Sequence, residues 1–350
     1  MRIKMQIIRR AVSTGALFAC ATVASGNEPV VEYVSNGRGP VPLYMPADYD
    51  GSEPLPGAQL ENYFNLVEQI EEHRFLYCVP QGTTNILGHP FWNATDVCCN
   101  FTGSNVDDSG YLRGLIDLVR SQYAVDEASI HFTGLSNGGF MSYRMGCDHA
   151  DIVASIAPLA GVTYENVALC SPSAPVHVLH VHGTADDTIL YDGGCFGAGC
   201  YPGAEGSVDR WLGYNGCSSS GEGGGEPFDL DGYVSGNETT STIYQSNCED
   251  GVTVELWTLA GSGHVPGFVV GGENALQNRY APRVVEWLLS HRKPAACLGD
   301  LDLDGLVDGT DLTVLLGSWN EQDEVLDLDD DGIIDGKDLA ILLSRWGSCS

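Results

Sequence analysis

A serine with the spacing of a hydrolase nucleophile lies in HFTGLSNGGF, residues 131–140. Ser136 is the centre of a G-x-S-x-G pattern that Gly134 and Gly138 complete. The chain contains 44 glycines, so the pattern alone is weak and its setting must decide. The apolar run SIHFT precedes it and the helical pattern GFMSYRM follows it, which is the strand–turn–helix context of a nucleophile elbow. We therefore interpret Ser136 as a nucleophile and the backbone N–H of Asn137 as one donor of an oxyanion hole.

A serine hydroxyl needs a general base, and that base needs a carboxylate to orient it. In hydrolases with this elbow, the acid and then the histidine follow the serine along the chain. The run VHVLHVHGTADD ends in two candidate acids, Asp186 and Asp187, of which we prefer Asp186. Downstream, His264 follows an apolar run in a glycine-rich loop, whereas His291 lies in a helical pattern beside basic residues. The expected set is Ser136 as nucleophile, His264 as general base and Asp186 as its orienting acid, with no cofactor for catalysis.

Strand-like and helical patterns alternate between residues 28 and 292. Such alternation predicts one α/β domain whose mainly parallel sheet is covered by helices. The expected strands are residues 74–80, 129–133, 153–159, 176–182 and 252–259, and the expected helices are residues 61–73, 111–123, 138–147 and 281–291.

The beginning of the chain has the pattern of a secretory signal peptide over residues 1–26. Four basic residues in the first ten are followed by an apolar run and then by small residues. A lipoprotein anchor at Cys20 is disfavoured, because Phe18 fits its cleavage box poorly. No later stretch is long enough to cross a bilayer, so we expect an extracellular, soluble protein.

Charge and cysteine content agree with export. The formal net charge of −31 disfavours nucleic acid and anionic membranes as partners. Twelve cysteines, eleven without the signal peptide, predict disulfides and one remaining thiol, which we assign to Cys78 in the apolar run FLYCVP. The cysteine spacing does not favour a zinc site. The expected pairs are Cys195–Cys200, Cys217–Cys248 and Cys297–Cys349.

The acidic tail, residues 297–350, contains a repeat with a period of 27 residues that maps Trp319 onto Trp346. DLDLDGLVDGTDLTVLLGSW and DLDDDGIIDGKDLAILLSRW each place carboxylates at positions 1, 3, 5, 9 and 12 of a loop, with glycine at position 6. Oxygen ligands at these positions, with the carbonyl of position 7, suit calcium, so we expect two ions. The predicted ligands are Asp300, Asp302, Asp304, Leu306, Asp308 and Asp311 in the first loop, and Asp327, Asp329, Asp331, Ile333, Asp335 and Asp338 in the second. Unneutralised carboxylates repel one another, so the tail should fold only with its ions.

Seven sequence blocks between residues 40 and 291 carry a family resemblance. They are YMPADYDGSEPLP, FWNATDVCCN, DDSGYLRGLIDLV, TGLSNGGFMSYRM, APLAG, LHVHGTADDTILYDGG and GSGHVPG. In this order they resemble the polyhydroxybutyrate depolymerase and feruloyl esterase-like group of secreted carbohydrate esterases. The resemblance implies an α/β-hydrolase fold and ester hydrolysis through an acyl-enzyme, with Ser136, Asp186 and His264 on the triad motifs.

The esterase resemblance also concerns four cysteines, and the tail carries a second resemblance of its own. The first implies that the tandem Cys98 and Cys99 pair with partners such as Cys147 and Cys170. The tail, with aspartate instead of glutamate at position 12 and no helix entering either loop, resembles a dockerin type I module. That resemblance implies a cohesin-type docking partner, although Gly309-Thr310 and Gly336-Lys337 form no matched recognition pair.

One departure from the esterase group concerns the oxyanion hole. In that group a strand of the type LVVLLHG follows the PLP segment, and its His-Gly turn supplies part of the hole. Here GSEPLP runs directly into GAQLENYFNL, and no four-residue apolar run lies between Tyr44 and Arg74. We therefore expect a central strand beside that of Ser136 to be missing, through a rearranged sheet or a damaged gene. Losing one oxyanion donor typically costs about 100- to 1000-fold in rate.

The leading hypothesis is a secreted serine esterase that cleaves acyl or feruloyl esters of plant polysaccharide and is carried to its site by the calcium-dependent tail. Within the same class, the alternative is depolymerisation of polyhydroxybutyrate. From another class, the absent oxyanion segment suggests a non-catalytic binding or scaffold protein.

Overall fold

A computed structural model describes most of the chain after the expected signal peptide, which lies outside the described residues. The described residues are 29–51, 55–60, 64–196, 199–272, 275–293, 299–301, 306–321, 326–329 and 331–348. Within these ranges, every helix is too short or too polar to cross a bilayer.

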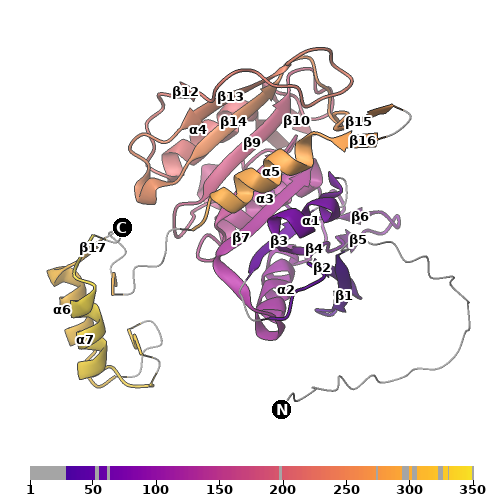
Figure 1. The fold of residues 1–350 in the computed structure, drawn as a ribbon. Helices are drawn as coiled ribbons and strands as arrows, with labels where there is room; N and C mark the ends of the chain where they lie inside the picture. The colour runs from indigo at the N-terminus through magenta and orange to yellow at the C-terminus, as the bar shows by residue number, and fades with distance from the viewer. Residues whose placement is uncertain are drawn as a thin grey trace, which may run out of the picture.

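One ten-stranded sheet organises the described part of residues 29–293 (Figure 1). From one edge to the other its strands are β1 (Val30–Val34), β2 (Val41–Met45), β4 (Leu76–Cys78), β3 (Leu55–Leu60), β7 (Val125–Leu135), β8 (Ser155–Leu159), β9 (His177–Gly183), β14 (Val254–Leu259), β13 (Thr239–Tyr244) and β12 (Glu222–Gly223). All five strands expected from the sequence are confirmed, as β4, β7, β8, β9 and β14.

The centre of the sheet is parallel, as expected for an α/β-hydrolase. β4, β3, β7, β8, β9 and β14 pair in parallel, and antiparallel pairs occur only toward the two margins of the described sheet. The register sets Leu135 opposite Leu159 and Gly183 opposite Leu259. The carboxyl ends of these strands therefore meet at one edge, where ligand sites of parallel sheets are found.

The strand that we expected to be missing is present. β3 lies between β4 and β7 and pairs in parallel with both. Its sequence LPGAQL contains no apolar run, but a strand paired on both sides satisfies its backbone whatever its side chains are. Its register on β7 shifts between Pro56 and Gly57, and such irregularities are where a sheet tolerates proline. The loop after β3 includes residues 61–63, which are outside the described residues, so the expected loss of an oxyanion donor there stays a prediction.

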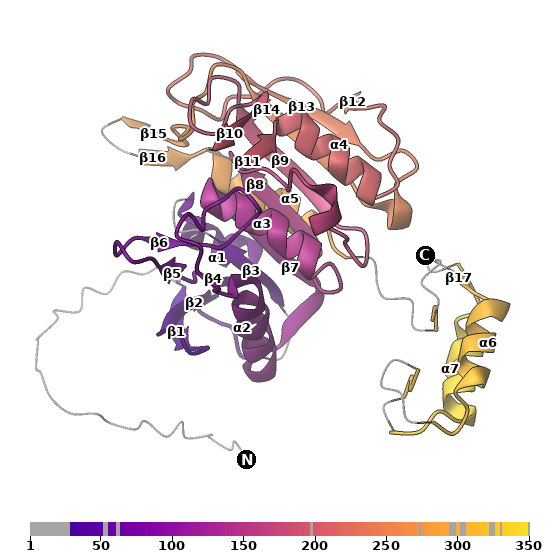
Figure 2. The same cartoon turned by 180° about the vertical axis from the view of Figure 1, so that it is seen from behind.

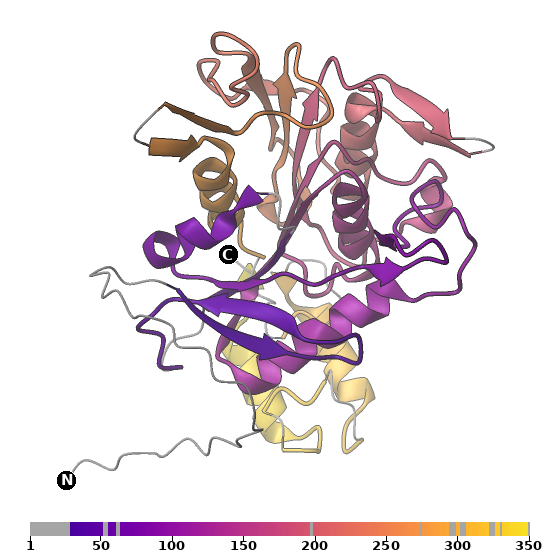
Figure 3. The same cartoon turned by 90° about the vertical axis from the view of Figure 1, so that its right-hand side faces the viewer.

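Helices cover both faces of the sheet (Figures 1–3). On one face, the apolar core includes side chains of α2 (Asp108–Gln122), α3 (Asn137–Asp148) and α4 (Ala204–Tyr214). On the other, it includes side chains of η2 (Leu66–Gln69), α1 (Ile70–His73) and α5 (Tyr280–Ser290). Figure 2 shows the first group in front and Figure 1 the second. The central strands lie between these two apolar cores.

Three of the four expected helices are confirmed, as α2, α3 and α5. The helix expected over residues 61–73 is interrupted: residues 61–63 lie outside the described residues, and after Asn65 the helical structure is η2 followed by the single turn α1. Asn65 and Arg74 have φ values of 53° and 51°, which interrupt a right-handed helix on both sides. The helix α4 was not expected. The remaining elements of this region are β5 (Thr83–Thr84), β6 (Pro90–Phe91), η3 (Val167–Leu169), β10 (Gly193–Phe196), β11 (Gly199–Pro202), η4 (Glu249–Gly251), β15 (Val269–Gly272) and β16 (Ala275–Asn278).

Two of the three expected disulfides lie in the described region and are confirmed, Cys195–Cys200 and Cys217–Cys248. The pairing implied by the family resemblance is wrong. Cys98 bonds to its neighbour Cys99, and Cys147 bonds to Cys170, because the end of α3 and the segment after η3 bring the latter two Cα atoms within 5.1 Å. Cys78 is a buried free thiol, as expected, and burial raises its pKa to about 12. The expected Cys297–Cys349 bond lies outside the described residues.

The acidic tail has a small apolar core of its own. Its helices α6 (Gly309–Gly317) and α7 (Gly336–Ser344) correspond to the two repeats. Short strands β17 (Leu306–Val307) and β18 (Gly347–Ser348) pair with each other near the two ends of the tail. The buried residues of this core are Val307, Leu315, Leu326, Ile334 and Leu342. The domain boundary itself stays a prediction.

Candidate functional site

Ser136 lies at a sharp turn between β7 and α3. Its φ of 55° and ψ of −119° are a conformation that non-glycine residues rarely adopt, and such strain is typical of functional sites. Glycine is required beside it, because a Cβ on Gly134 would lie 2.6 Å from the carbonyl carbon of Gly138. The backbone N–H of Ser136 donates to the carbonyl of Leu159 at the end of β8 (2.9 Å). This is the nucleophile elbow that the sequence predicts.

Asn137 is the first residue of α3, where a backbone N–H has no acceptor within the helix. Its side chain is fixed by the loop that contains Trp92. The amide oxygen of Asn137 accepts the backbone N–H of Trp92 (2.7 Å), and its amide nitrogen donates to the carbonyl of Trp92 (3.0 Å). The helix start beside the serine hydroxyl is thereby anchored to residues that line the adjacent cavity.

That cavity has a volume of about 450 Å³ and is bordered by Ser136, Asn137 and Gln81. Its apolar lining includes Val79, Phe91, Trp92, Leu112, Phe132, Leu135 and Met141. A concave, mostly apolar space with a few convergent polar groups is the usual form of a small-ligand site. The cavity therefore offers room for an apolar substrate group directly beside the serine.

Asp186 follows β9 and is buried, with a side chain fully shielded from solvent. One carboxylate oxygen accepts the backbone N–H groups of Thr188 (2.8 Å) and Ile189 (2.9 Å). The other lies 2.8 Å from Nδ1 of His264 and 3.3 Å from Nε2 of His182. Burial by itself would raise the pKa of Asp186, but these hydrogen bonds outweigh it and hold the pKa below its usual value. The carboxylate therefore stays ionised beside His264.

The structure distinguishes Asp186 and His264 from the alternative acid Asp187 and the alternative base His291. Asp187 is exposed and its carboxylate contacts the hydroxyl of Thr188 (3.3 Å). His291 stacks on Trp287 and packs near His177, at the amino end of β9, whereas Asp186 follows the carboxyl end of that strand. The structure thus brings Asp186 and His264 together and places both at the sheet edge that carries Ser136. The catalytic roles of these residues stay a prediction.

The loop of His264 approaches Asp186 because a glycine leaves room for it. A Cβ on Gly183 would lie 2.3 Å from the carbonyl oxygen of Ser262, and the same oxygen accepts the backbone N–H of Ala185 (2.9 Å). The sequence alone does not reveal this role of Gly183, because it does not show that the loops after β9 and β14 are neighbours.

The glycine-rich excursion closed by Cys217–Cys248 supports the histidine loop, a role that the sequence did not reveal. Asp231, 1% exposed, accepts the backbone N–H of Gly267 (2.7 Å) and that of Tyr233 (2.9 Å). The backbone N–H of Gly232 donates to the carbonyl of Gly267 (2.8 Å). These bonds tie the excursion to the segment just after His264.

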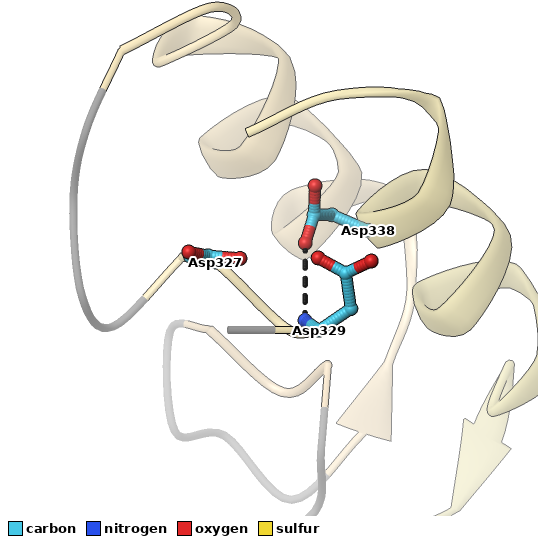
Figure 4. Close-up of side chains that lie close together, drawn as sticks. All are labelled: Asp327, Asp329 and Asp338. Carbon is cyan, nitrogen blue, oxygen red and sulfur yellow. Dashed lines mark hydrogen bonds between the residues drawn. The ribbon is translucent and has the colours of Figure 1, made fainter. Parts of the chain in front are cut away.

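In the tail, the second loop brings three predicted calcium ligands together. The carboxylates of Asp327, Asp329 and Asp338 have oxygens within 4.8 Å of one another (Figure 4). Gly332 at position 6 has a φ of +90°, and its N–H donates to Asp327 (2.6 Å). Asp338 also accepts the backbone N–H groups of Leu328 (2.7 Å) and, at the helix start, Asp335 (2.7 Å). Hard oxygen donors around a tight glycine turn fit a calcium ion.

Two further ligands of this loop have other contacts in the structure. Asp335 caps α7 in a capping box with Asp338, which is a stabilising role that needs no metal. Lys337 forms an ion pair with Asp331 and lies 3.5 Å from Asp329. Asp308 and Asp311 cap α6 in the same way. Asp302 and Asp304 of the first loop lie outside the described residues, so the first ion site stays a prediction.

No family model matches the chain. Feruloyl esterase B of Piromyces equi is 32% identical over 184 residues, which are 50% of this chain and 31% of that protein. A probable feruloyl esterase C of Aspergillus niger is 27% identical over 191 residues, 52% of this chain and 63% of that protein. A poly(3-hydroxybutyrate) depolymerase of Ralstonia pickettii is 30% identical over 100 residues, 28% of this chain and 20% of that protein. The chain thus spans less than two thirds of the length of each of these three relatives.

Among solved structures, the chain is similar to acetyl xylan esterase from Aspergillus awamori. The TM-score is 0.46 at 15% sequence identity, covering 74% of this chain and 98% of that one.

Proposed function

We propose that this protein is a secreted serine esterase that cleaves acyl or feruloyl esters of plant polysaccharide through an acyl-enzyme. One observation carries the proposal: His264 is hydrogen-bonded to a buried, ionised Asp186 at the sheet edge where Ser136 occupies a strained elbow. A base with an orienting carboxylate, next to a nucleophile turn, is the arrangement that acyl transfer to serine requires.

The steps follow from the proton positions. Because the Nδ1–H of His264 donates to Asp186, its Nε2 is left with a lone pair that can take the proton of the Ser136 hydroxyl. The serine oxygen then bonds to the acyl carbon, and the N–H of Asn137 stabilises the negative charge on the acyl oxygen. The C–O bond to the sugar breaks and the alcohol leaves with the proton of His264. Water, deprotonated by the same Nε2, then attacks the acyl-enzyme and releases the acid.

The substrate class rests on the cavity and on the relatives. A cavity of about 450 Å³ beside Ser136, with both apolar and polar groups in its lining, has room for an aromatic or aliphatic acyl group. The two feruloyl esterases among the relatives are named for such substrates. Extracellular location is proposed from the residues of the expected signal peptide.

The activity is tested with p-nitrophenyl acetate and a fluorophosphonate probe. Hydrolysis and covalent labelling should both be lost in Ser136→Ala. The control Ser109→Ala removes a buried hydroxyl that contacts His149 in the same domain, and it should keep both. A folded wild-type protein with neither turnover nor labelling would contradict the proposal.

A second candidate, hydrolysis of a polyester, is favoured by the similarity to the Ralstonia pickettii depolymerase. Assays with methyl ferulate and with a film of poly(3-hydroxybutyrate) distinguish the two activities. A feruloyl esterase should hydrolyse methyl ferulate and leave the film intact. The scaffold alternative depends on the absent oxyanion segment. β3 occupies the place of the central strand, but the loop after it includes residues 61–63, which are outside the described residues, so this alternative stays open to the labelling test.

For the tail, we propose a calcium-dependent docking module that binds a cohesin-type partner. The clustered carboxylates of Asp327, Asp329 and Asp338 support the second ion site. Calcium would neutralise the loop carboxylates and let the loops close against α6 and α7. A calcium titration that leaves the far-ultraviolet circular dichroism and the melting temperature of the tail unchanged would reject this role.

A further inference from the structure

A hydrogen-bonded chain of three buried side chains runs through the core behind Asp186. The hydroxyl of Tyr143 on α3 lies 2.6 Å from Nδ1 of His180, and Nε2 of His180 lies 3.1 Å from Nδ1 of His182, both on β9. Nε2 of His182 lies 2.8 Å from the carbonyl oxygen of Ile189 and 3.3 Å from Asp186. All three of these side chains are fully buried.

The chain of hydrogen bonds has one direction when both histidines are neutral. A carbonyl oxygen only accepts, so Nε2 of His182 carries a hydrogen, and its Nδ1 then accepts from His180. Nδ1 of His180 is left to accept the hydroxyl hydrogen of Tyr143. Burial lowers the pKa of His180 well below its usual value and raises that of Tyr143 well above, which keeps both groups neutral. The Nε2–H of His182 therefore donates to the carbonyl of Ile189, and the same nitrogen lies 3.3 Å from the carboxylate of Asp186.

The last side chain of this hydrogen-bonded series, His182, lies beside the same carboxylate oxygen of Asp186 that His264 contacts. Nδ1 of His264 and Nε2 of His182 both lie within 3.3 Å of that oxygen, while backbone N–H groups hold the other. The other titratable side chain that faces the His182 ring in the described chain is Tyr191, which contacts the ring at its edge, with the ring centres 5.7 Å apart. Fixed donors on both oxygens leave the carboxylate little freedom to rotate.

We propose that His182 is a positioning residue for Asp186. Tyr143 and His180 keep the proton of His182 on Nε2, the nitrogen that bonds the Ile189 carbonyl and faces the carboxylate. This inference rests on the proposed esterase function, since it assigns a role within the same site. A residue that orients an acid changes turnover rather than substrate binding, and its effect disappears when the acid is removed.

Steady-state kinetics on p-nitrophenyl acetate test the role. His182→Leu should lower kcat by about 10- to 100-fold, with KM within about twofold, because it removes the N–H that lies 3.3 Å from the charged carboxylate. His182→Gln, which keeps an N–H donor, should recover kcat to within about fivefold of the wild type. If kcat of His182→Leu stays within twofold of the wild type, the proposal is overturned.

A matched control lies on the same strand. His177 is also a buried histidine of β9 with two hydrogen bonds, one to the carbonyl of Arg292 (3.1 Å) and one from the N–H of Thr253 (2.9 Å). His177→Leu should lower the melting temperature but leave kcat within about twofold. An equal loss of kcat in His177→Leu and His182→Leu would show a general effect of stability and overturn the positioning role.

A double-mutant cycle and a measurement without activity complete the test. In an Asp186→Asn background, His182→Leu should change kcat by less than about twofold, whereas additive losses would contradict the mechanism.

Nitrogen-15 NMR of the wild-type protein should show His180 and His182 as single Nε2–H tautomers between pH 6 and 8. Mixed tautomers would contradict the proposed hydrogen-bonded series even if the enzyme is active. Single tautomers in an inactive protein would contradict only the esterase function. If His182→Leu does not fold, Tyr143→Phe should give a mixed His180 tautomer.

Discussion

Nδ1 of His264 lies 2.8 Å from a carboxylate oxygen of Asp186, although 78 residues separate the two in the sequence. The contact depends on the parallel pairing of β9 and β14, which brings Gly183 opposite Leu259 and sets the two following loops side by side. A buried carboxylate that accepts three hydrogen bonds and lies 3.3 Å from Nε2 of His182 stays ionised and fixes the tautomer of His264.

Replacing Asp186 with asparagine should lower kcat by about 10⁴-fold, because an amide can stabilise the wrong tautomer of His264. The matched variant Asp187→Asn changes an exposed neighbour and should remain within about twofold of the wild type. Initial rates on p-nitrophenyl acetate measure both. A larger loss for Asp187→Asn would show that the acid is misassigned.

Asp231→Ala should lower kcat by about tenfold, since it removes the acceptor of the Gly267 N–H and loosens the segment after His264. Glu226→Ala, an exposed change in the same excursion, serves as the control. Rates and melting curves are recorded together. Equal kcat values for the two variants would mean that the excursion does not support the histidine loop.

Gly134→Ala should reduce the free energy of unfolding by about 1–3 kcal/mol, because the added methyl group would collide with the backbone of Gly138. It should also displace Ser136 and lower kcat. Gly213→Ala, at an exposed position in the last turn of α4 with open space around the new Cβ, should instead add up to about 0.5–1 kcal/mol. Urea denaturation compares the two, and opposite signs are expected.

The main domain should lose stability as the pH falls from 7 to 5. Burial lowers the pKa of His131 and of His177 to about 3, so below about pH 6.5 the unfolded chain binds protons that the folded protein does not. Each such histidine decreases the free energy of unfolding by up to about 1.4 kcal/mol per pH unit. Asp186, whose pKa is lowered, adds a loss in the same direction only below about pH 4.

Urea midpoints at pH 7 and pH 5 measure this dependence. His131→Asn should flatten it, whereas a change at the exposed His89 to glutamine should leave it as in the wild type. An unchanged or higher wild-type midpoint at pH 5 would contradict the assignment of neutral buried histidines.

Lys337→Ala should tighten calcium binding by the second loop about two- to fivefold. The ammonium pairs with Asp331 and lies 3.5 Å from Asp329, and these carboxylates raise the pKa of Lys337 to about 12, so the lysine competes with the ion. Arg345→Ala, an exposed change after the same helix, controls for net charge. Calorimetric titration gives the affinities, and equal values for the two variants would indicate a nonspecific charge effect.

Local patterns in the sequence were sufficient for the elbow, for most of the central strands and for the two repeats of the tail. Each depends on neighbouring residues: an apolar run before G-x-S-x-G, alternating strands and helices, or carboxylates around a glycine. Burial of apolar runs and the backbone freedom of glycine act over a few residues, so these features are visible without coordinates.

Only the tertiary structure decided the rest. β3 is identified as a strand by its pairing with β4 and β7, because its sequence LPGAQL has no strand pattern. The pairing of Cys147 with Cys170 depends on where α3 ends. The choice of Asp186 over Asp187, and the buried chain through His182, depend on which side chains face each other across the sheet edge. Such contacts join residues far apart in the chain, and their geometry comes from strand register and packing, which no local pattern encodes.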